Sequence, residues 1–166
     1  MALGAILADQ LDGTRDWTLK LLADIAGDDW GFQPAPGLAH PLFLCGHLAC
    51  AQHLLVHERC LGRPFLDPAF AAHFPIGGPI PSVREHDYPA PHEIRRLMDE
   101  IHARTLTAVR AMSDAQLAEP AYGRDGAIHP HYRDQRGAIA HCSRHEAFHA
   151  GQLALIRRLL AKPFLR

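Results

Sequence analysis

The chain has 166 residues, of which 48% are hydrophobic, and its 17 Lys and Arg against 18 Asp and Glu give a formal net charge of -1. This length and apolar content suit one domain with a single core, which we expect to span residues 1–166. The balanced charge, without a run of either sign, argues against binding to nucleic acid or to an anionic membrane surface.

The N-terminal half predicts two amphipathic helices. Apolar residues recur every three or four positions across residues 3–26, which is typical of a helix with one buried face. Residues 28–40 are rich in Gly and Pro and predict a loop. Pro41 suits the first turn of a second helix, because a proline there gives up no intrahelical hydrogen bond. We expect this helix to end near Leu61.

The next segment predicts a long loop followed by a third helix. Residues 62–89 contain many prolines and glycines, which argue against a long regular element. Pro91 opens the third helix, whose inner stripe of apolar residues ends at Met112. Residues 113–116 then have the S-x-x-Q form of a capping box and predict one short helical turn.

A fourth long helix completes the predicted fold. Residues 119–133 predict a second loop, and Asp134 is a suitable N-cap for a helix that ends near Ala161. The chain shows no internal repeat and no convincing alternation of the kind that strands show. Four long amphipathic segments predict an all-α protein with the architecture of a four-helix bundle.

The N-terminus and the cysteines both indicate a cytoplasmic protein. The first residues lack the basic and apolar regions of a signal peptide, and no apolar stretch is long enough to span a bilayer. The four cysteines form no C-x-x-C pair and are too few for a disulfide scaffold in a chain of this length. We therefore expect a soluble, cytoplasmic protein with reduced thiols.

Histidine is unusually frequent, with 13 in the chain, and three lie on one face of the fourth helix. His141, His145 and His149 are four residues apart, so each step rotates only about 40° around the helix axis. The same face carries Leu153 and Ile156 and should turn toward the core. Several imidazoles inside an apolar face predict a divalent metal site, because burying them without a shared ion leaves donors and acceptors unsatisfied.

A catalytic metal site typically has three protein ligands and one open position. The i,i+4 spacing lets His145 and His149 bind one ion, and His47 lies on the inward stripe of the second helix. We predict His47, His145 and His149 as the metal ligands. His141 has two possible roles, either as a ligand in place of His149 or as a hydrogen-bond partner of the ligands.

Other residues near these stripes have simpler interpretations. His53 and His57 lie on the flank of the second helix, toward solvent or a neighbouring helix. Cys142 could also bind the ion, but we interpret it as a buried apolar thiol. Glu146 lies about 100° around the helix from His145, which favours a solvated or helix-pairing charge over a general base. The competing interpretation of the whole set is that these histidines are ordinary core or surface residues.

The fourth helix resembles the last helix of the DinB-like superfamily. The resemblance rests on the run H-x3-H-E-A-F-H-A-G-Q-L-A-L-I-R-R at residues 141–158. It extends to Gly-His-Leu-Ala at residues 46–49 and to Phe-x-Pro-x-Pro-Gly at residues 32–37. These three pieces occur in the family's order, so the resemblance covers the whole domain.

The resemblance implies a topology, an assembly and a cofactor. The superfamily is known for up-down-down-up four-helix bundles, often dimeric, in which three histidines hold a divalent ion, commonly nickel or zinc. The ligands carried over from the family fall on His47, His145 and His149. A homodimer is the assembly that this resemblance implies.

Neighbouring residues of the motif agree with the family except at one position. Gly151 and Gln152 match the family's Gly-Gln, and His141 matches a recurrent histidine that is not usually counted as a ligand. Many members have Arg directly after the last ligand, where this chain has Ala150. The ligands stay in place, but the comparison with members that use this Arg is weakened.

Two functions fit such a site, both with a small-molecule partner. The first is a metal-dependent enzyme, in which the ion's charge would acidify a bound water, as in a hydrolase, or a bound thiol. Thiol chemistry is implied by the superfamily's transferases and isomerases, which use low-molecular-weight thiols such as bacillithiol or mycothiol. The alternative is a non-catalytic metal or small-molecule binding module of a stress response. A fourth coordination position open to solvent favours the enzyme, and a fourth protein ligand favours the module.

Overall fold

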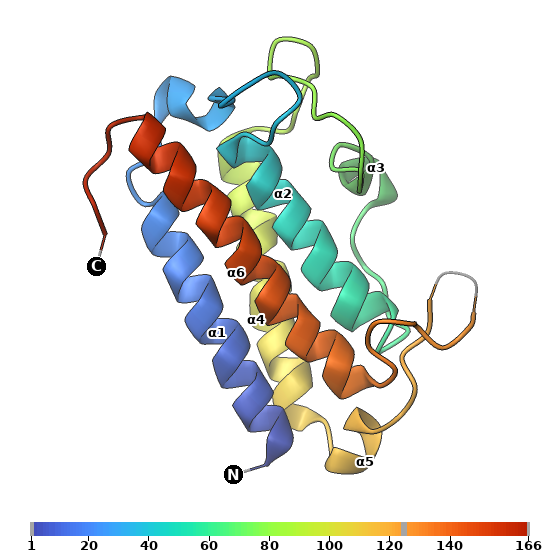
Figure 1. The fold of residues 1–166 in the computed structure, drawn as a ribbon. Coiled ribbons are helices and arrows are strands. Elements are labelled where there is room, and N and C mark those ends of the chain that lie inside the picture. Colours follow the sequence, from blue (N-terminus) through green and yellow to red (C-terminus); the bar gives the residue numbers. More distant parts are fainter. Residues whose placement is uncertain (1, 124–125, 166) are drawn as a thin grey trace.

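The computed structural model describes residues 2–123 and 126–165 (Figure 1). Within these residues the protein is all-helical and has no β-strand. None of the helices there is both long and apolar enough to cross a membrane. Four long helices form the body of the molecule: α1 (Leu3–Leu22), α2 (Pro41–Gln52), α4 (Pro91–Ala111) and α6 (Gln135–Leu159).

The four long helices lie side by side, and each packs against two of the others (Figure 1). α1 and α6 run in one direction along the molecule, and α2 and α4 run in the opposite direction. Their apolar faces meet in two buried clusters, which accounts for the spacing of apolar residues in the sequence. The first cluster includes Leu44, Met98 and Leu153, and the second includes Leu11, Val109 and Ile139.

Two predicted helix starts are confirmed by capping hydrogen bonds. The Asp134 side chain accepts a hydrogen bond from the backbone N–H of Gly137 at 2.7 Å and so caps α6. The Ser113 hydroxyl accepts one from the backbone N–H of Gln116 at 3.3 Å and begins α5 (Asp114–Leu117). Both side chains satisfy N–H groups that the first turn of a helix leaves without an intrahelical partner.

Two predicted helix ends are wrong. α1 ends at Leu22, before the 3-10 helix η1 (Gly27–Gly31). The predicted helix was too long because Ile25, which lies in the turn after α1, is also buried and continues the apolar spacing. α2 ends at Gln52, and the expected continuation is the π-helix η2 (His53–Glu58). The predicted loop at residues 62–89 contains a short helix, α3 (Pro68–Ala72), which packs against α2.

The π-helix buries two histidines, and each of them makes a hydrogen bond to a neighbouring segment. His53 Nε2 accepts hydrogen bonds from the backbone N–H groups of Phe65 at 2.9 Å and Leu66 at 3.1 Å. His57 Nε2 lies 3.0 Å from the Thr105 hydroxyl on α4. Of the two surroundings predicted for these histidines, the structure shows the protein interior and not solvent. His53 thus ties residues 62–90, called the strap below, to the end of α2, and His57 ties η2 to α4.

Candidate metal centre

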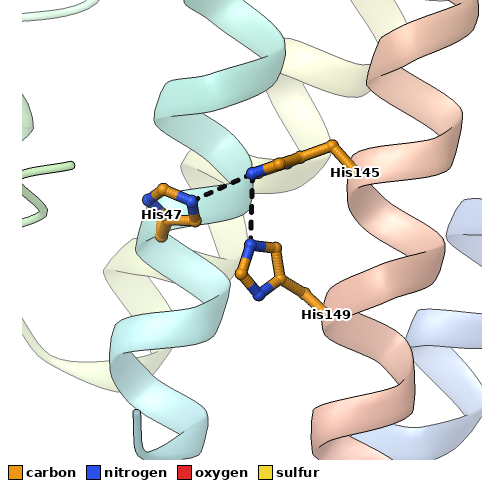
Figure 2. A group of neighbouring side chains, drawn as sticks. All are labelled: His47, His145 and His149. Carbon is orange, nitrogen blue, oxygen red and sulfur yellow. Dashed lines mark hydrogen bonds between the residues drawn. The ribbon is translucent and has the colours of Figure 1, made fainter. Parts of the chain in front are cut away.

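Three histidines meet between α2 and α6 (Figure 2). His47 projects from α2, and His145 and His149 project from successive turns of α6. The Nε2 atom of His145 lies 3.1 Å from the Nε2 atoms of both His47 and His149. One nitrogen from each ring lies within 4.8 Å of the other two. The structure therefore brings together the three residues that the sequence predicted as ligands.

Packing around α2 explains why His47 points toward α6. The Phe43 ring stacks on the His47 ring with centroids 5.7 Å apart and an angle of 10° between the planes. Phe74 from the strap packs directly against Gly46, where a Cβ atom would lie 2.2 Å from the Phe74 ring. A glycine is therefore required at this position for the strap to approach α2 beside His47.

Hydrogen bonds alone leave the cluster incompletely satisfied. A neutral imidazole has one N–H donor and one nitrogen lone pair. His145 Nε2 carries either a proton or a lone pair, so it can make only one well-aligned hydrogen bond of its two 3.1 Å contacts. A cation at the meeting point would instead satisfy one lone pair from each of His47, His145 and His149.

Gln152 determines which nitrogen of His149 faces the cluster. The Gln152 Oε1 atom lies 2.7 Å from His149 Nδ1. Because an amide oxygen only accepts hydrogen bonds, Nδ1 carries the proton and Nε2 presents its lone pair toward His145. Metal-binding histidines commonly have such a partner on the second nitrogen, which orients the ring and raises the basicity of the first.

Burial keeps all three rings neutral. Desolvation, followed by the charges of the neighbouring imidazoles, lowers the pKa of His47 to about 4 and that of His145 to about 3. The pKa of His149 is also lowered, mainly by burial. At neutral pH the rings therefore keep the lone pairs that a metal ion needs.

The spacing of the nitrogens suits a small divalent ion. Two ligands bound to zinc at about 2.0–2.1 Å with tetrahedral angles stand about 3.3 Å apart. The two Nε2 pairs that include His145 are each 3.1 Å apart, and all three nitrogens lie within 4.8 Å of one another. Across residues 2–123 and 126–165, no fourth His, Cys, Asp or Glu joins the group. Three protein ligands are the number typical of a catalytic site, whereas structural zinc sites usually have four.

Comparison with known families identifies the family of this chain. A family model described as the DinB superfamily matches residues 10–153, a range that includes all three histidines. The chain belongs to the DinB superfamily. The resemblance found in the sequence motifs is thereby confirmed. A search of curated proteins gave no match.

In this DinB protein, His141 lies beside the cluster rather than in it. Its ring stacks on Tyr132 with centroids 5.4 Å apart and lies 6.0 Å from the ring of His145. Among the described residues, its nitrogens are not grouped with the three that converge. His141 is thus a neighbour of His145 in this structure.

The two other residues weighed on the fourth helix are both buried. Burial raises the pKa of the Cys142 thiol to about 12, as expected for a thiol that packs as an apolar group. Glu146 is 2% exposed, and its Oε1 atom lies 2.6 Å from Nε of Arg15 on α1. Of the two roles predicted for Glu146, the structure supports the helix-pairing charge and not the solvated one.

Sequence reasoning missed a cavity beside the histidines. The strap folds back along α2 and encloses with it a cavity of about 610 Å³, whose lining includes His47. Cys50, His53 and Glu58 also line it, on the side of α2 and η2. The prolines of residues 62–89 signalled an irregular segment, but an irregular segment has no periodicity that could indicate where it packs.

Proposed function

We propose that this DinB protein binds one divalent ion, nickel or zinc, through His47, His145 and His149, and acts as a metal-dependent enzyme on a small molecule. The observation that carries the proposal is the meeting of three neutral imidazole nitrogens that cannot satisfy one another by hydrogen bonds. When bound, such an ion would keep its charge among neutral ligands and so acidify a coordinated water or thiol. This chemistry suits a hydrolase or a transferase that uses a low-molecular-weight thiol.

The described surroundings favour the enzyme over a non-catalytic binding module. The three histidines leave a coordination position for an outside ligand, since no fourth protein ligand joins them within the described chain. The cavity that His47 lines has a volume of about 610 Å³, which lies in the range of small-molecule sites. The cavity opens to solvent at its edge, where the exposed residues Glu58 and Ile76 line it. A module that only stores the ion would need no such space.

The lining of the cavity indicates the class of substrate. Most of the described residues that line it are apolar, none is Lys or Arg, and Glu58 is the acidic one. Burial raises the pKa of the Cys50 thiol to about 12 and lowers the pKa of His53, so both side chains are neutral at pH 7. Away from the ion itself, an anionic group would meet no partner charge on the cavity wall. We therefore propose a substrate with an apolar body that carries no negative charge away from the group that meets the ion.

An exposed apolar surface on α1 and α6 supports a proposal for the assembly. We propose a cytoplasmic homodimer with a single domain and the up-down-down-up helix order of the superfamily. The support for a dimer is an apolar surface on α1 and α6, where Trp17 is 66% exposed and Phe148 is 67% exposed. Trp17 also lines a groove with Ala147 and Gly151 of α6. Light scattering on the purified protein tests the dimer, and a monomer at micromolar concentration would contradict it.

Elemental analysis of protein purified without a histidine tag tests the metal site. The wild type should carry about one equivalent of metal. His47→Ala and His149→Ala should each carry much less, with helix content retained by circular dichroism. His92→Ala, which replaces an exposed histidine on α4, is the matched control and should keep the metal. Equal metal content in all four proteins would remove the site assignment.

A substrate screen on the loaded protein then separates the possible activities. Ester and amide substrates are tested with and without added small thiols. Turnover without a thiol supports the hydrolase, and turnover that depends on a thiol supports the transferase. A fully loaded protein that turns over none of the substrates supports the binding module instead.

A further inference from the structure

One buried guanidinium joins all four long helices at the centre of the molecule. Arg15 of α1 is 2% exposed. Its Nε and one terminal nitrogen donate hydrogen bonds to the two carboxylate oxygens of Glu146 on α6, at 2.6 and 3.2 Å. The same terminal nitrogen donates to Gln52 Oε1 of α2 at 2.9 Å, and the other donates to the Met98 carbonyl of α4 at 3.0 Å.

The hydrogen bonds continue through Gln52 back to α1. With its Oε1 accepting from Arg15, the Gln52 amide nitrogen donates to His102 Nδ1 of α4 at 3.1 Å. His102 Nε2 then carries the proton and donates to Asp12 Oδ1 at 3.2 Å. Every member has a partner, so the network has one consistent arrangement of donors and acceptors. We call Arg15, Glu146, Gln52, His102 and Asp12 the central network.

The central network lies within about one and a half helical turns of the three histidines along α6 and α2. On α6, Glu146 directly follows His145, and on α2, Gln52 lies about one and a half turns after His47. The two apolar clusters lie on either side of it along the helices, with Leu11 before and Leu21 after Arg15 on α1. The network therefore crosses the bundle near the metal site, and not at one of its ends.

Such a network fixes the rotation of the two helices that carry the histidines. Adjacent residues on a helix point about 100° apart, so holding Glu146 against Arg15 also sets the direction of His145. A side-chain atom about 5–6 Å from the helix axis moves about 1 Å for each 10° that the helix rotates. Metal–ligand distances tolerate deviations of only about 0.2 Å. Small rotations of α6 or α2 would therefore separate the three nitrogens.

We propose that Arg15 and Glu146 are positioning residues for the metal site, acting through the orientation of α6 and α2. This inference rests on the proposed function, since it requires His47, His145 and His149 to bind an ion. The planar guanidinium of Arg15 is essential to this positioning role, because its nitrogens donate hydrogen bonds to three other helices at fixed angles. A lysine would keep the charge but could not hold all three at once.

The test measures zinc affinity of the metal-free protein by calorimetry, and the stability of the metal-free form separately by thermal melting. Arg15→Met combined with Glu146→Leu removes both charges together, so no unpaired charge is left in the core to attract the cation. Arg15→Lys retains the charge and loses the geometry. In both variants the dissociation constant for zinc should rise at least about tenfold, as for other partners that orient metal ligands.

A second ion pair between α1 and α6 provides the matched control. Arg157 of α6 is 3% exposed and pairs with Asp24, which follows α1, about two turns beyond His149. Arg157→Met combined with Asp24→Leu should lower the melting temperature of the metal-free protein. Its zinc affinity should stay within about twofold of the wild type, because distant sites act independently.

Each outcome supports or overturns the inference. Weakened zinc binding in both Arg15 variants, with affinity kept in the control, supports it. Unchanged affinity in a folded Arg15→Lys or double variant overturns it and leaves a purely structural ion pair. Equal weakening in the control overturns it as well, because any loss of stability would then have the same effect. A wild type that binds no zinc would instead refute the proposed function.

Discussion

The stability of the metal-free protein should depend on pH through His57, which is 6% exposed and lies outside the group of three converging histidines. Burial, and secondarily the neighbouring His53, lowers the pKa of His57 from 6.5 to about 4. Between these values the unfolded chain takes up a proton that the folded chain does not. The contribution of His57 is therefore fully present above pH 6.5 and is lost as the pH falls toward 4.

The size of this effect follows from the two pKa values. A difference of one pKa unit corresponds to about 1.4 kcal/mol, so lowering the pKa of His57 from 6.5 to about 4 corresponds to about 3 kcal/mol of unfolding free energy. A little over half of this loss should occur between pH 7 and pH 5. Other buried histidines also titrate, so the measurement must isolate His57. His57→Gln provides a neutral side chain of similar size that does not titrate.

Urea denaturation at pH 7, 6, 5 and 4 on chelator-treated protein measures the difference in unfolding free energy between wild type and His57→Gln. At pH 7 the variant should be the less stable protein, since it loses ring packing against His53 and Phe65. The difference should move in favour of the variant by about 3 kcal/mol as the pH falls to 4. Parallel stability curves for the two proteins would refute the argument.

Three further substitutions test the local packing and the orientation of His149. In thermal melts, Gly46→Ala should destabilise the protein by about 1–3 kcal/mol, because the new methyl group collides with the buried Phe74 ring. Gly151→Ala is the control, because a Cβ atom there meets nothing within 4 Å. It should leave the stability unchanged or raise it by up to about 1 kcal/mol. Gln152→Ala should raise the zinc dissociation constant about 10–100-fold without changing the stoichiometry of one ion per chain, because His149 loses the partner on Nδ1. An unchanged dissociation constant in calorimetry would contradict this.

Periodic features of the sequence predicted most of the bundle. The long helices follow from apolar residues at helical spacing, and the start of α6 follows from Asp134 as a cap. The three histidines were found for the same reason, since two share one face of α6 and the third lies on the inward face of α2. Local spacing determines which side chains point inward, and a bundle brings inward-pointing side chains together.

The remaining features depend on contacts between distant residues. Glu146 was placed correctly around the helix, but its partner Arg15 lies 131 positions away, and no local pattern joins the two. The π-helix at residues 53–58 bonds to the backbone of the strap, which has no periodicity of its own. The cavity beside His47 could not be predicted either, because one of its walls is the strap, whose packing no periodic sequence pattern indicates.

Anomalous diffraction from crystals of the protein loaded with zinc tests most directly whether the three histidines bind an ion. The account predicts a single strong peak between α2 and α6, at about 2.0–2.1 Å from one nitrogen of each of His47, His145 and His149. A peak at any other position, or crystals in which the three rings contact one another without an ion at saturating zinc, would contradict it.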